Sequence, residues 1–536
     1  MAVFKINSWM GGISPFSDRG IKGAFKMGRN LDIRKDVDTL TCGQALKEEG
    51  LFGVSHSQSA SVSSSASISP SSSGSRSVSP SPTPSISNSA SRSPSSSASP
   101  SASASPSASP SPTASSSVSP SLSPSAGLNN VFVDLIHFFV KCSDGNTYGF
   151  GNAGNIYRRF PDGFWRNVYK DPDGQIKGAE EKPAVGTTYL QWATGTKVKQ
   201  KQIPGNSNWT DVTIVAENLT DADWHTMKQV GGANMIASGS YLAMVGYDGS
   251  WTNEALDLIP GNIAKALVER NGRVVTGTYK AGYPNKGVNA MIDCEVPLAQ
   301  IGDDGELYFA NFTDTMPVKR FPGGGRVNPG GVANEVDQIN IFDWESTALS
   351  WIDKQTLGNM SLWGVFNADT DYNGVYTYGR KNKEQPFTLN LEYALEVDEI
   401  GAVVNIEGTT LISYRDGADF GVKAVDPDNK GTGTYESLEF RAPMKNAEEL
   451  TKWDLAELFM EPLPSGCSVE LFYRMNKDSA WTRAFTADNN ASYTKASGRK
   501  ATFRIGAQGD VYEQKIVLNP SSNSTPTVLR SRTYFN

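Results

Sequence analysis

Histidine and cysteine are scarce in this 536-residue chain, which limits the chemistry it can carry. The chain has only three histidines, which are His56, His137 and His225. Its four cysteines form no Cys-x-x-Cys pair, and they are Cys42, Cys142, Cys294 and Cys467. The chain therefore offers few side chains for a zinc site with imidazole ligands or for a Ser-His-Asp catalytic triad. We interpret the cysteines as buried thiols, with a disulfide frame or a metal site as the alternatives.

Long basic and long apolar runs are also missing. The net charge is −7, and no Lys/Arg run longer than a pair stands out, so no nucleic-acid partner is predicted. The most apolar run, Val131 to Val140, contains Asp134 and His137 and is too short to span a bilayer, so no membrane insertion is predicted. The N-terminal residues lack the apolar region of a secretory signal. These absences predict a soluble protein made in the cytoplasm.

Serine dominates residues 54–127, where it alternates with Ala, Pro, Val or Ile. This stretch contains no Asp, Glu or Lys, and only Arg76 and Arg92 carry charge. It cannot bury enough apolar surface to offset its ordering entropy. We predict a disordered, partly polyproline II insertion, with a glycosylated stalk or a β-stacked serine array as alternatives. Deleting residues 56–124 should therefore leave the melting transition nearly unchanged.

Hairpin signals recur after residue 129. Apolar strands flank glycine-containing turns whose glycines lie 43 to 69 residues apart, at Gly145, Gly195, Gly249, Gly305, Gly374 and Gly417. Asp-Gly and Asn-Gly between such strands favour hairpins. Repeats of this length with short strands are typical of β-propellers. An irregular β-sandwich with coincidental spacing is the alternative.

The fold class predicted is all-β: a six- or seven-bladed β-propeller followed by a C-terminal antiparallel β-sandwich, with the Ser/Pro-rich insertion between strands. Residues 1–53 supply N-terminal strands that close the propeller, residues 54–127 form the insertion, and residues 128–434 form the propeller. Residues 435–536 alternate apolar and polar positions and form the sandwich. Within them, Ala447 to Glu457 is predicted as one or two helical turns, or a loop.

Carboxylates are plentiful, but turn chemistry explains many of them. Six aspartates directly precede a glycine at expected turns, and they are Asp144, Asp162, Asp173, Asp248, Asp304 and Asp416. They resemble sialidase Asp-boxes only loosely, and glycoside hydrolysis by paired channel acids is the alternative. Asp303-Asp304 and Asp398-Glu399 are interpreted as solvated turns, with Ca²⁺ binding as the alternative.

The remaining candidates also favour structural roles. His137 and His225 are interpreted as core or interface residues. The glycines around Arg326 are interpreted as a flexible turn, because no Lys-Ser/Thr pair or helix follows to make a phosphate cradle. Aromatic residues near turns are expected to pack between blades, with sugar stacking as the alternative, and they are Tyr148, Trp165, Trp192, Trp251, Tyr308 and Tyr376. No catalytic, cofactor-binding or metal-binding residue is assigned.

Several segments resemble the β-propeller virion proteins of tailed bacteriophages. They include residues 11–15, 30–35, 143–159, 189–204, 223–227 and 255–267, and residues 509–536 are similar to the sandwich that often ends phage tail proteins. The resemblance implies a structural component of the virion tail, near the tail tip or adhesion apparatus, and no catalytic residues. The serine-rich insertion departs from the family pattern.

Two functions are therefore compared. The first is a non-enzymatic virion protein, assembled in the host cytoplasm, that contacts other tail proteins, forms a homo-oligomer, and has a host-surface glycan as a further candidate partner. The second is a secreted carbohydrate-active or lectin-like propeller with a sandwich binding module. The second requires an export signal, which the N-terminal residues do not show.

Overall fold

The computed structural model describes residues 2–13, 24–34, 39–50, 132–205, 208–222, 225–258, 261–270, 273–280, 298–301, 307–310, 316–321, 334–339, 359–365, 373–380, 388–442, 450–476 and 480–536. The described residues belong to one unit, Met1–Ser55 with Leu128–Asn536. The prediction of a disordered insertion at residues 54–127 lies outside the described residues.

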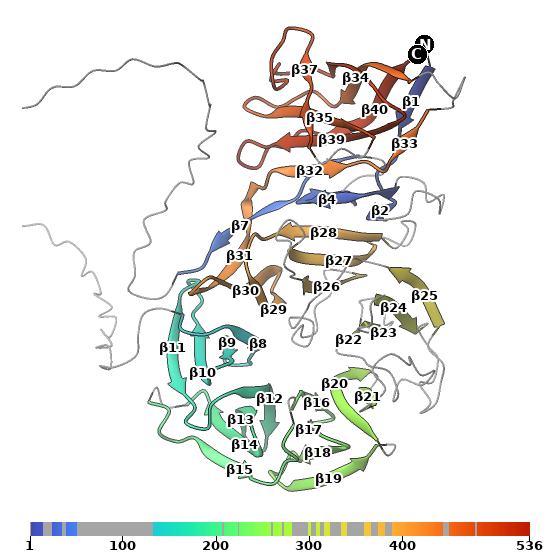
Figure 1. Cartoon of the computed structure of the whole chain (residues 1–536). Coiled ribbons are helices and arrows are strands. Elements are labelled where there is room, and N and C mark those ends of the chain that lie inside the picture. The colour runs from blue at the N-terminus through green and yellow to red at the C-terminus, as the bar shows by residue number, and fades with distance from the viewer. Residues whose placement is uncertain are drawn as a thin grey trace, which may run out of the picture. The chain divides into compact units, whose positions relative to one another are not determined.

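All regular elements in the described ranges are β-strands, as the sequence predicts. Within those ranges no helix has the length and apolar character needed to cross a membrane. Three antiparallel meanders of four strands follow residue 132 (Figure 1). The first meander consists of β8 (Ile136–Lys141), β9 (Thr147–Gly151), β10 (Asn155–Arg159) and β11 (Trp165–Lys170). The second consists of β12 (Ile176–Ala184), β13 (Thr187–Thr194), β14 (Lys197–Ile203) and β15 (Thr213–Ala216). The third consists of β16 (Met227–Val230), β17 (Ala233–Ser238), β18 (Tyr241–Val245) and β19 (Trp251–Asp257).

Four further groups of strands follow in the same order along the chain. They are β20 (Asn262–Arg270) with β21 (Arg273–Lys280); β22 (Leu298–Ile301), β23 (Leu307–Ala310), β24 (Met316–Phe321) and β25 (Asn334–Ile339); β26 (Asn359–Val365), β27 (Gly374–Arg380) and β28 (Thr388–Ala394); and β29 (Glu399–Ile406), β30 (Thr409–Asp416) and β31 (Asp419–Lys430) with β7 (Gln44–Glu48).

The first strands of neighbouring sheets contact one another. β8 contacts both β12 and β29, β12 contacts β16, β16 contacts β20, β20 contacts β22, and β26 contacts β29. Successive meanders whose first strands meet in chain order are the arrangement of a β-propeller. The chain therefore has the propeller-type fold predicted from its hairpin repeats.

The turn glycines explain why these hairpins form. Gly145, Gly195, Gly249 and Gly417 have φ of +83°, +51°, +88° and +58°, a backbone conformation that side chains beyond glycine rarely adopt. Gly374 differs from the prediction, because it begins β27 instead of lying in the turn before it. Gly305 lies outside the described residues.

The N-terminal strands pair with widely separated parts of the chain. β7 pairs with β31 and so completes the four-stranded sheet of β29, β30 and β31. By contrast, β1 (Ala2–Ile6) pairs with the last strand, β40 (Val528–Phe535), so residues 1–53 do not all belong to the propeller. β4 (Met27–Arg29) pairs with β28 on one side and with β32 (Gly433–Glu436) on the other. Two short pairs complete this segment: β2 (Gly12–Ile13) with β3 (Ala24–Phe25), and β5 (Leu31–Asp32) with β6 (Thr41–Cys42).

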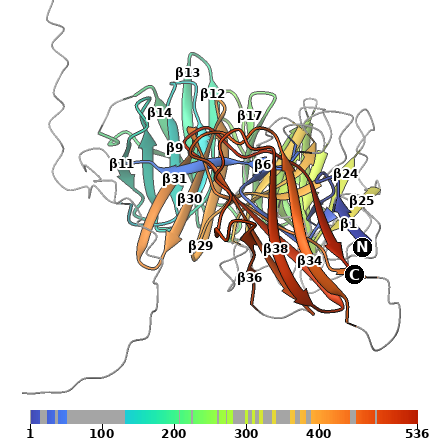
Figure 2. The ribbon, with the colours of Figure 1, turned by 90° about the horizontal axis from the view of Figure 1, so that it is seen from above.

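Two sheets make up the C-terminal part. One has the order β1, β40, β34 (Lys452–Met460), β38 (Lys500–Gln508) and β37 (Phe485–Thr486). The other continues from β4 and β32 into β39 (Val511–Asn519), β35 (Ser468–Met475) and β36 (Thr482–Arg483), and β33 (Phe440–Arg441) also pairs with β39. Their inner faces share one apolar core, in which Trp453 stacks on Tyr512 with ring centroids 4.5 Å apart. Figure 2 shows both chain ends beside the first sheet.

The helical alternative for Ala447 to Glu457 is wrong from Lys452 onward, where the chain forms β34. Trp453, Ala456, Leu458 and Met460 are buried between half-buried neighbours. A β-bulge between Trp453 and Leu455 shifts the alternation by one residue. That shift is why the apolar spacing at the start of the strand resembles a helical one.

Candidate functional site

Both described histidines lie inside the protein. His225 is fully buried, with Nδ1 2.8 Å from the carbonyl oxygen of Ala237 and Nε2 2.5 Å from that of Gly195. Burial lowers its pKa despite these contacts. Burial also lowers the pKa of His137 to about 4. These environments confirm the predicted structural role of both residues, since a buried neutral imidazole is not presented to a ligand.

The aspartates at hairpin turns act as backbone caps. Asp144, Asp162 and Asp248 accept hydrogen bonds from the amides two residues ahead, at 2.9, 3.2 and 3.0 Å. This is the Asx-turn interaction predicted from the Asp-Gly sequences. At the Asp173-Gly174 turn the capping residue is Asp171, which the sequence analysis did not name. Asp171 accepts a hydrogen bond from the amide of Asp173 at 2.9 Å. Asp304 lies outside the described residues.

The acidic pair Asp398-Glu399 has protein partners on both members. Asp398 accepts from the Gly417 amide at 2.8 Å, and Glu399 accepts from the Arg415 guanidinium at 2.9 Å. Across the described ranges, no group of three His, Cys, Asp or Glu is placed to hold a metal ion. Cys42, Cys142 and Cys467 are free buried thiols, as predicted. Asp303, Arg326 and its glycines, and Cys294 lie outside the described residues.

The aromatic residues near turns mostly pack inside. Tyr148, Trp165, Trp192 and Tyr376 are at most 3% exposed, which confirms the packing interpretation for them. Trp251 is half-buried, and its Nε1 donates to Asn218 at 2.9 Å. The side chain of Tyr308 lies outside the described set.

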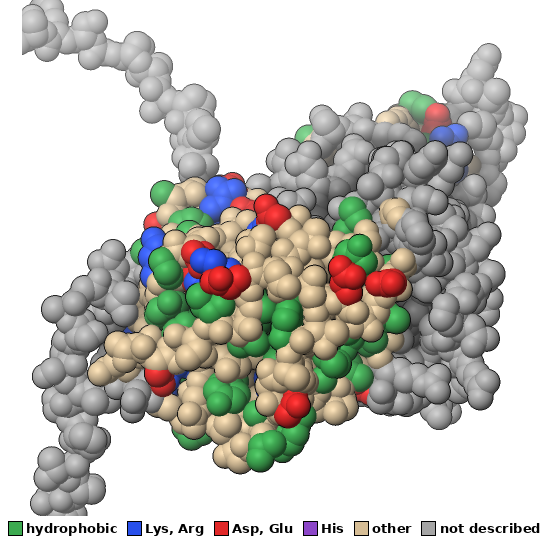
Figure 3. All heavy atoms as spheres, turned by 90° about the horizontal axis from the view of Figure 1, so that it is seen from below, with side chains coloured by type: hydrophobic (Ala, Val, Ile, Leu, Met, Phe, Trp, Pro, Cys, Tyr) green, Lys and Arg blue, Asp and Glu red, His purple; other side chains and the backbone are tan. Residues whose placement is uncertain are grey.

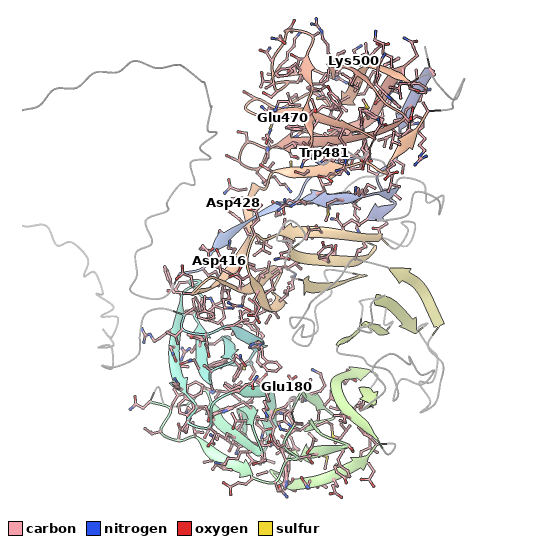
Figure 4. All side chains as sticks on the ribbon, viewed as in Figure 1. Glu180, Asp416, Asp428, Glu470, Trp481 and Lys500 are labelled. Carbon is pink, nitrogen blue, oxygen red and sulfur yellow. The ribbon has the colours of Figure 1, made fainter. Side chains whose placement is uncertain are left out.

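Charged groups inside the propeller sheets pair with one another. Lys199 and Asp171 are 4% and 0% exposed, and Lys199 Nζ lies 2.5 Å from Asp171 Oδ1. Trp192 Nε1 donates to the other carboxylate oxygen at 2.7 Å. Lys228 on β16 pairs with Glu180 on β12 at 3.1 Å (Figure 4 labels Glu180). This second pair links the first strands of adjacent sheets, and removing one member of either pair would leave a buried charge without its partner.

In contrast to these paired charges of the propeller, the outward side of the first C-terminal sheet carries mostly cations, and we call it the basic face. The strand registers place Lys5 beside Arg532, Arg532 beside Glu457, and Phe459 between Arg530 and Lys500. Opposite positions of paired strands point to the same side of a sheet. With Arg504, which lies opposite Leu455, the basic face carries five Lys/Arg side chains and one carboxylate. It is strongly basic in a chain of net charge −7.

Three cations of the basic face surround one aromatic ring. The Arg530 and Arg532 guanidinium carbons lie 4.3 and 4.9 Å from the centroid of Phe459, and Lys500 Nζ lies 5.9 Å from it. A guanidinium stacked on a ring keeps its in-plane N–H donors open for a carboxylate. The stacking therefore orients both arginines. Arg530 is exposed, whereas Arg532 is half-buried and its Nε atom is enclosed, so its outer guanidinium nitrogens are the ones a carboxylate can reach.

Few of these cations have an acidic partner. Lys500 (labelled in Figure 4) pairs with Glu457 at 2.6 Å, and Tyr534 donates to the same carboxylate at 2.8 Å. Burial raises the pKa of Glu457, but these two hydrogen bonds and the attraction to Lys500 and Arg532 lower it overall. Among the described residues, Lys5, Arg530 and Arg532 have no carboxylate within ion-pair distance. In the described part of the chain, Lys500 is thus the one cation of the basic face with an ion-pair partner, and the other four have none.

Sequence reasoning missed the basic face. Arg530 and Arg532 alternate with buried Ser531 and Thr533, which is visible in the sequence as an outward-facing pair. What the sequence does not show is that Lys5, more than five hundred residues away, joins them across β1 and β40.

Comparisons with known proteins give fold-level similarity only. No protein-family model and no curated protein matches the chain. Among solved structures, it is similar to the Cps50 (Swd1) β-propeller domain of Myceliophteria thermophila at TM-score 0.38 and 10% identity, over 56% of this chain and 99% of that one. The WD40 β-propeller domain of Doa1 gives 0.34 and 12%, over 56% and 95%. The PQQ-bound aldose sugar dehydrogenase of Streptomyces coelicolor gives 0.35 and 10%, over 55% and 95%. Similarities of this size transfer no activity, substrate or partner to this chain.

Proposed function

We propose that the chain is a non-enzymatic structural component of a tailed bacteriophage virion, in the tail or its adhesion apparatus, acting through protein–protein contacts. The observation that carries the proposal is the continuous sheet through β28, β4 and β32. Arg29 on β4 is paired in register with Leu391 on one side and with Thr434 on the other. Backbone hydrogen bonds thus join the propeller to the C-terminal sheets.

This junction is reinforced by side chains. The buried Arg34 guanidinium donates to the carbonyl oxygen of Thr388 at 2.6 Å and to Thr377 Oγ1 at 2.9 Å, which ties the N-terminal segment to β27 and β28. Asn390 Nδ2 donates to the Leu31 carbonyl oxygen at 2.8 Å. A binding module tethered by a linker moves independently of its neighbour, whereas shared strands transmit position. A rigid junction suits a part that must hold a fixed place in an assembly.

The finer architecture belongs to the same proposal. We assign seven blades, which begin at β8, β12, β16, β20, β22, β26 and β29, and we assign the two C-terminal sheets to a β-sandwich. β7 completes the last blade, and β4 links the sixth blade to the sandwich. The N-terminal segment would then connect the propeller to the C-terminal sandwich, because its strands pair with strands of both.

Mass spectrometry of purified phage particles tests the function. The proposal predicts peptides of this chain in particles that are purified through two gradients, at a fixed ratio to known tail proteins. A chain that is abundant in the infected-cell lysate but absent from particles would contradict it. Turnover of a glycan panel, lost on substitution of buried propeller carboxylates such as Glu180, would contradict the non-enzymatic part.

A further inference from the structure

The basic face carries more cations than the described part of the chain supplies with carboxylates, since Glu457 is its one acidic side chain. Lys5, Arg530 and Arg532 are outward-facing, and Arg530 and Arg532 are held in place by stacking on Phe459. Val3 and Leu529 beside them are large apolar side chains with exposures of 37% and 40%. Unpaired cations beside exposed apolar groups favour contact with an acidic surface that also has apolar groups.

A surface of that chemistry occurs on the propeller, and we call it the acidic edge. It consists of the outermost strand β19 and the turn before it, with exposed Asp248, Glu254 and Asp257. Tyr247 and Leu256 are 49% and 47% exposed there. No Lys or Arg occurs from residue 229 to residue 264. Figure 3, seen from the side on which β19 lies in Figure 1, shows acidic and hydrophobic side chains interspersed.

The carboxylates of the acidic edge are available. In the described part of the chain, Glu254 and Asp257 have no Lys or Arg within ion-pair distance. Asp248 caps Ser250 through one oxygen, at 3.0 Å from the amide and 2.6 Å from the hydroxyl. Lys182 attracts Asp248 electrostatically, but within the described ranges no Lys or Arg lies within ion-pair distance of this carboxylate. The acidic edge thus complements the basic face in both charge and apolar content.

We propose that the basic face of one copy docks on the acidic edge of a second copy. The inference rests on the proposed function as an assembly component and adds which surfaces assemble. Because the two surfaces differ, the contact is head-to-tail, so each copy keeps one free surface of each kind. Such contacts close into a ring or extend into a filament.

The area of the basic face limits the affinity expected for the contact between two copies. The three central strands have eight or nine residues, whereas β1 has five and β37 has two. With strands about 4.8 Å apart, the face presents roughly 500 Å². Stable interfaces bury about 800 Å² on each partner, so apolar burial alone gives a modest affinity. Charge complementarity then contributes most to the association rate and to specificity. The association should therefore weaken at least tenfold between about 0.05 and 0.5 M salt, as screening shortens the range of the attraction.

Charge reversal with mixing tests the contact in the full-length chain. One variant carries Arg530→Glu and Arg532→Glu, and the other carries Glu254→Arg and Asp257→Arg. Sedimentation velocity at low salt should show multimers for the wild type and monomers for each variant alone. An equimolar mixture should associate again, because the unchanged acidic edge of the first meets the unchanged basic face of the second. The variant with all four changes should also associate by itself.

Matched variants control for nonspecific charge effects. Arg483→Glu with Lys515→Glu reverses two cations on the other C-terminal sheet, and Asp416→Arg with Asp419→Arg reverses two exposed carboxylates at the β30–β31 turn. Both should associate like the wild type. A monomeric wild type at all concentrations would overturn the proposal, and so would variants that still associate alone or fail to associate when mixed.

Other occupants give different results. If the basic face holds an acidic polysaccharide, the wild type stays monomeric and binds hyaluronan in a way that Arg530→Glu with Arg532→Glu abolishes. That result overturns the self-docking inference while leaving the virion proposal intact. Restored association on mixing, together with absence of the chain from purified particles, would overturn the virion proposal alone.

Discussion

The outward faces of the two C-terminal sheets contain the same residue types in opposite electrostatic states. On β35, β36 and β39, which form the paired face, each cation has a carboxylate: Arg474 with Glu513 at 2.6 Å, Arg483 with Glu470 at 3.1 Å, and Lys515 with Glu436 at 3.2 Å. On the basic face, Lys5, Arg530 and Arg532 have none among the described residues. The comparison separates cations that contribute to stability from cations that remain for a partner.

Aromatic stacking is common to both faces, so it does not cause the difference. On the paired face Trp481 lies under Arg474 at 4.5 Å and under Lys515 at 5.6 Å. On the basic face Phe459 has the same role for Arg530 and Arg532. What differs is the number of carboxylates. The paired face has Glu513, Glu470 and Glu436 for its three cations. The basic face has Glu457 from β34 for five cations, and Glu457 is bonded to Lys500.

Removing one partner of the most buried pair should have the largest effect. Arg474→Ala leaves the Glu513 carboxylate, 1% exposed, with Lys26 at 3.3 Å as its one remaining cation among the described residues. We expect a loss of about 3 kcal/mol in the free energy of unfolding, since an unpaired buried charge is costly. Arg530→Ala on the basic face should change it by less than about 0.5 kcal/mol. Urea unfolding of both variants measures the contrast, and equal losses would contradict it.

Acid should weaken the same pair. Burial raises the pKa of Glu513, but hydrogen bonds from Arg474 and attraction to Lys26 and Arg474 lower it overall. A carboxyl whose folded pKa lies below its unfolded value stabilises the fold above the unfolded value, and that stability is lost as pH falls through the folded pKa.

The wild type should therefore lose stability as pH drops below about 4.5, the region of an ordinary Glu. Arg474→Met should flatten that part of the profile, because it removes the interaction that lowers the pKa of Glu513. Melting temperatures of both proteins between pH 6 and 3 measure the difference. A parallel decline in the two proteins would show that Glu513 is not the group responsible.

Salt should affect self-association more than folding. The buried Arg474–Glu513 pair is screened little, so melting at low concentration should change only slightly between about 0.05 and 0.5 M salt. Sedimentation over the same range should show the wild-type multimers dissociating. Multimers that persist at high salt would indicate an apolar contact instead of the one proposed.

Much of the fold follows from local sequence, because hairpin partners are adjacent in the chain. The Asp-Gly turns predict β8–β9, β18–β19 and β30–β31 through residues that meet within about ten positions. Long-range pairing carries no such signal: β4 meets β28 and β32, and β1 meets β40, across hundreds of residues. The C-terminal strands themselves alternate clearly, but which strand lies beside which is decided by packing around Trp453 and Tyr512.

The same limit explains why the basic face was missed while the turn aspartates were interpreted correctly. Asp144 caps an amide two residues away, so its role can be predicted from a few consecutive residues. The basic face exists only after β1, β40, β34 and β38 assemble. One or two cations in a strand do not indicate a charged surface until the register of that strand with its neighbours is known.

The melting temperature of the variant Arg530→Gln with Arg532→Gln, measured at a concentration where all proteins are monomeric, tests the central claim that these cations have no ion-pair partner within one copy. Glutamine removes both charges without adding a carboxylate opposite Glu457. The account predicts a value within about 1 °C of the wild type, because surface substitutions without lost partners cost little. A drop as large as that of Arg474→Ala would contradict it, since the two arginines would then be needed for the fold itself.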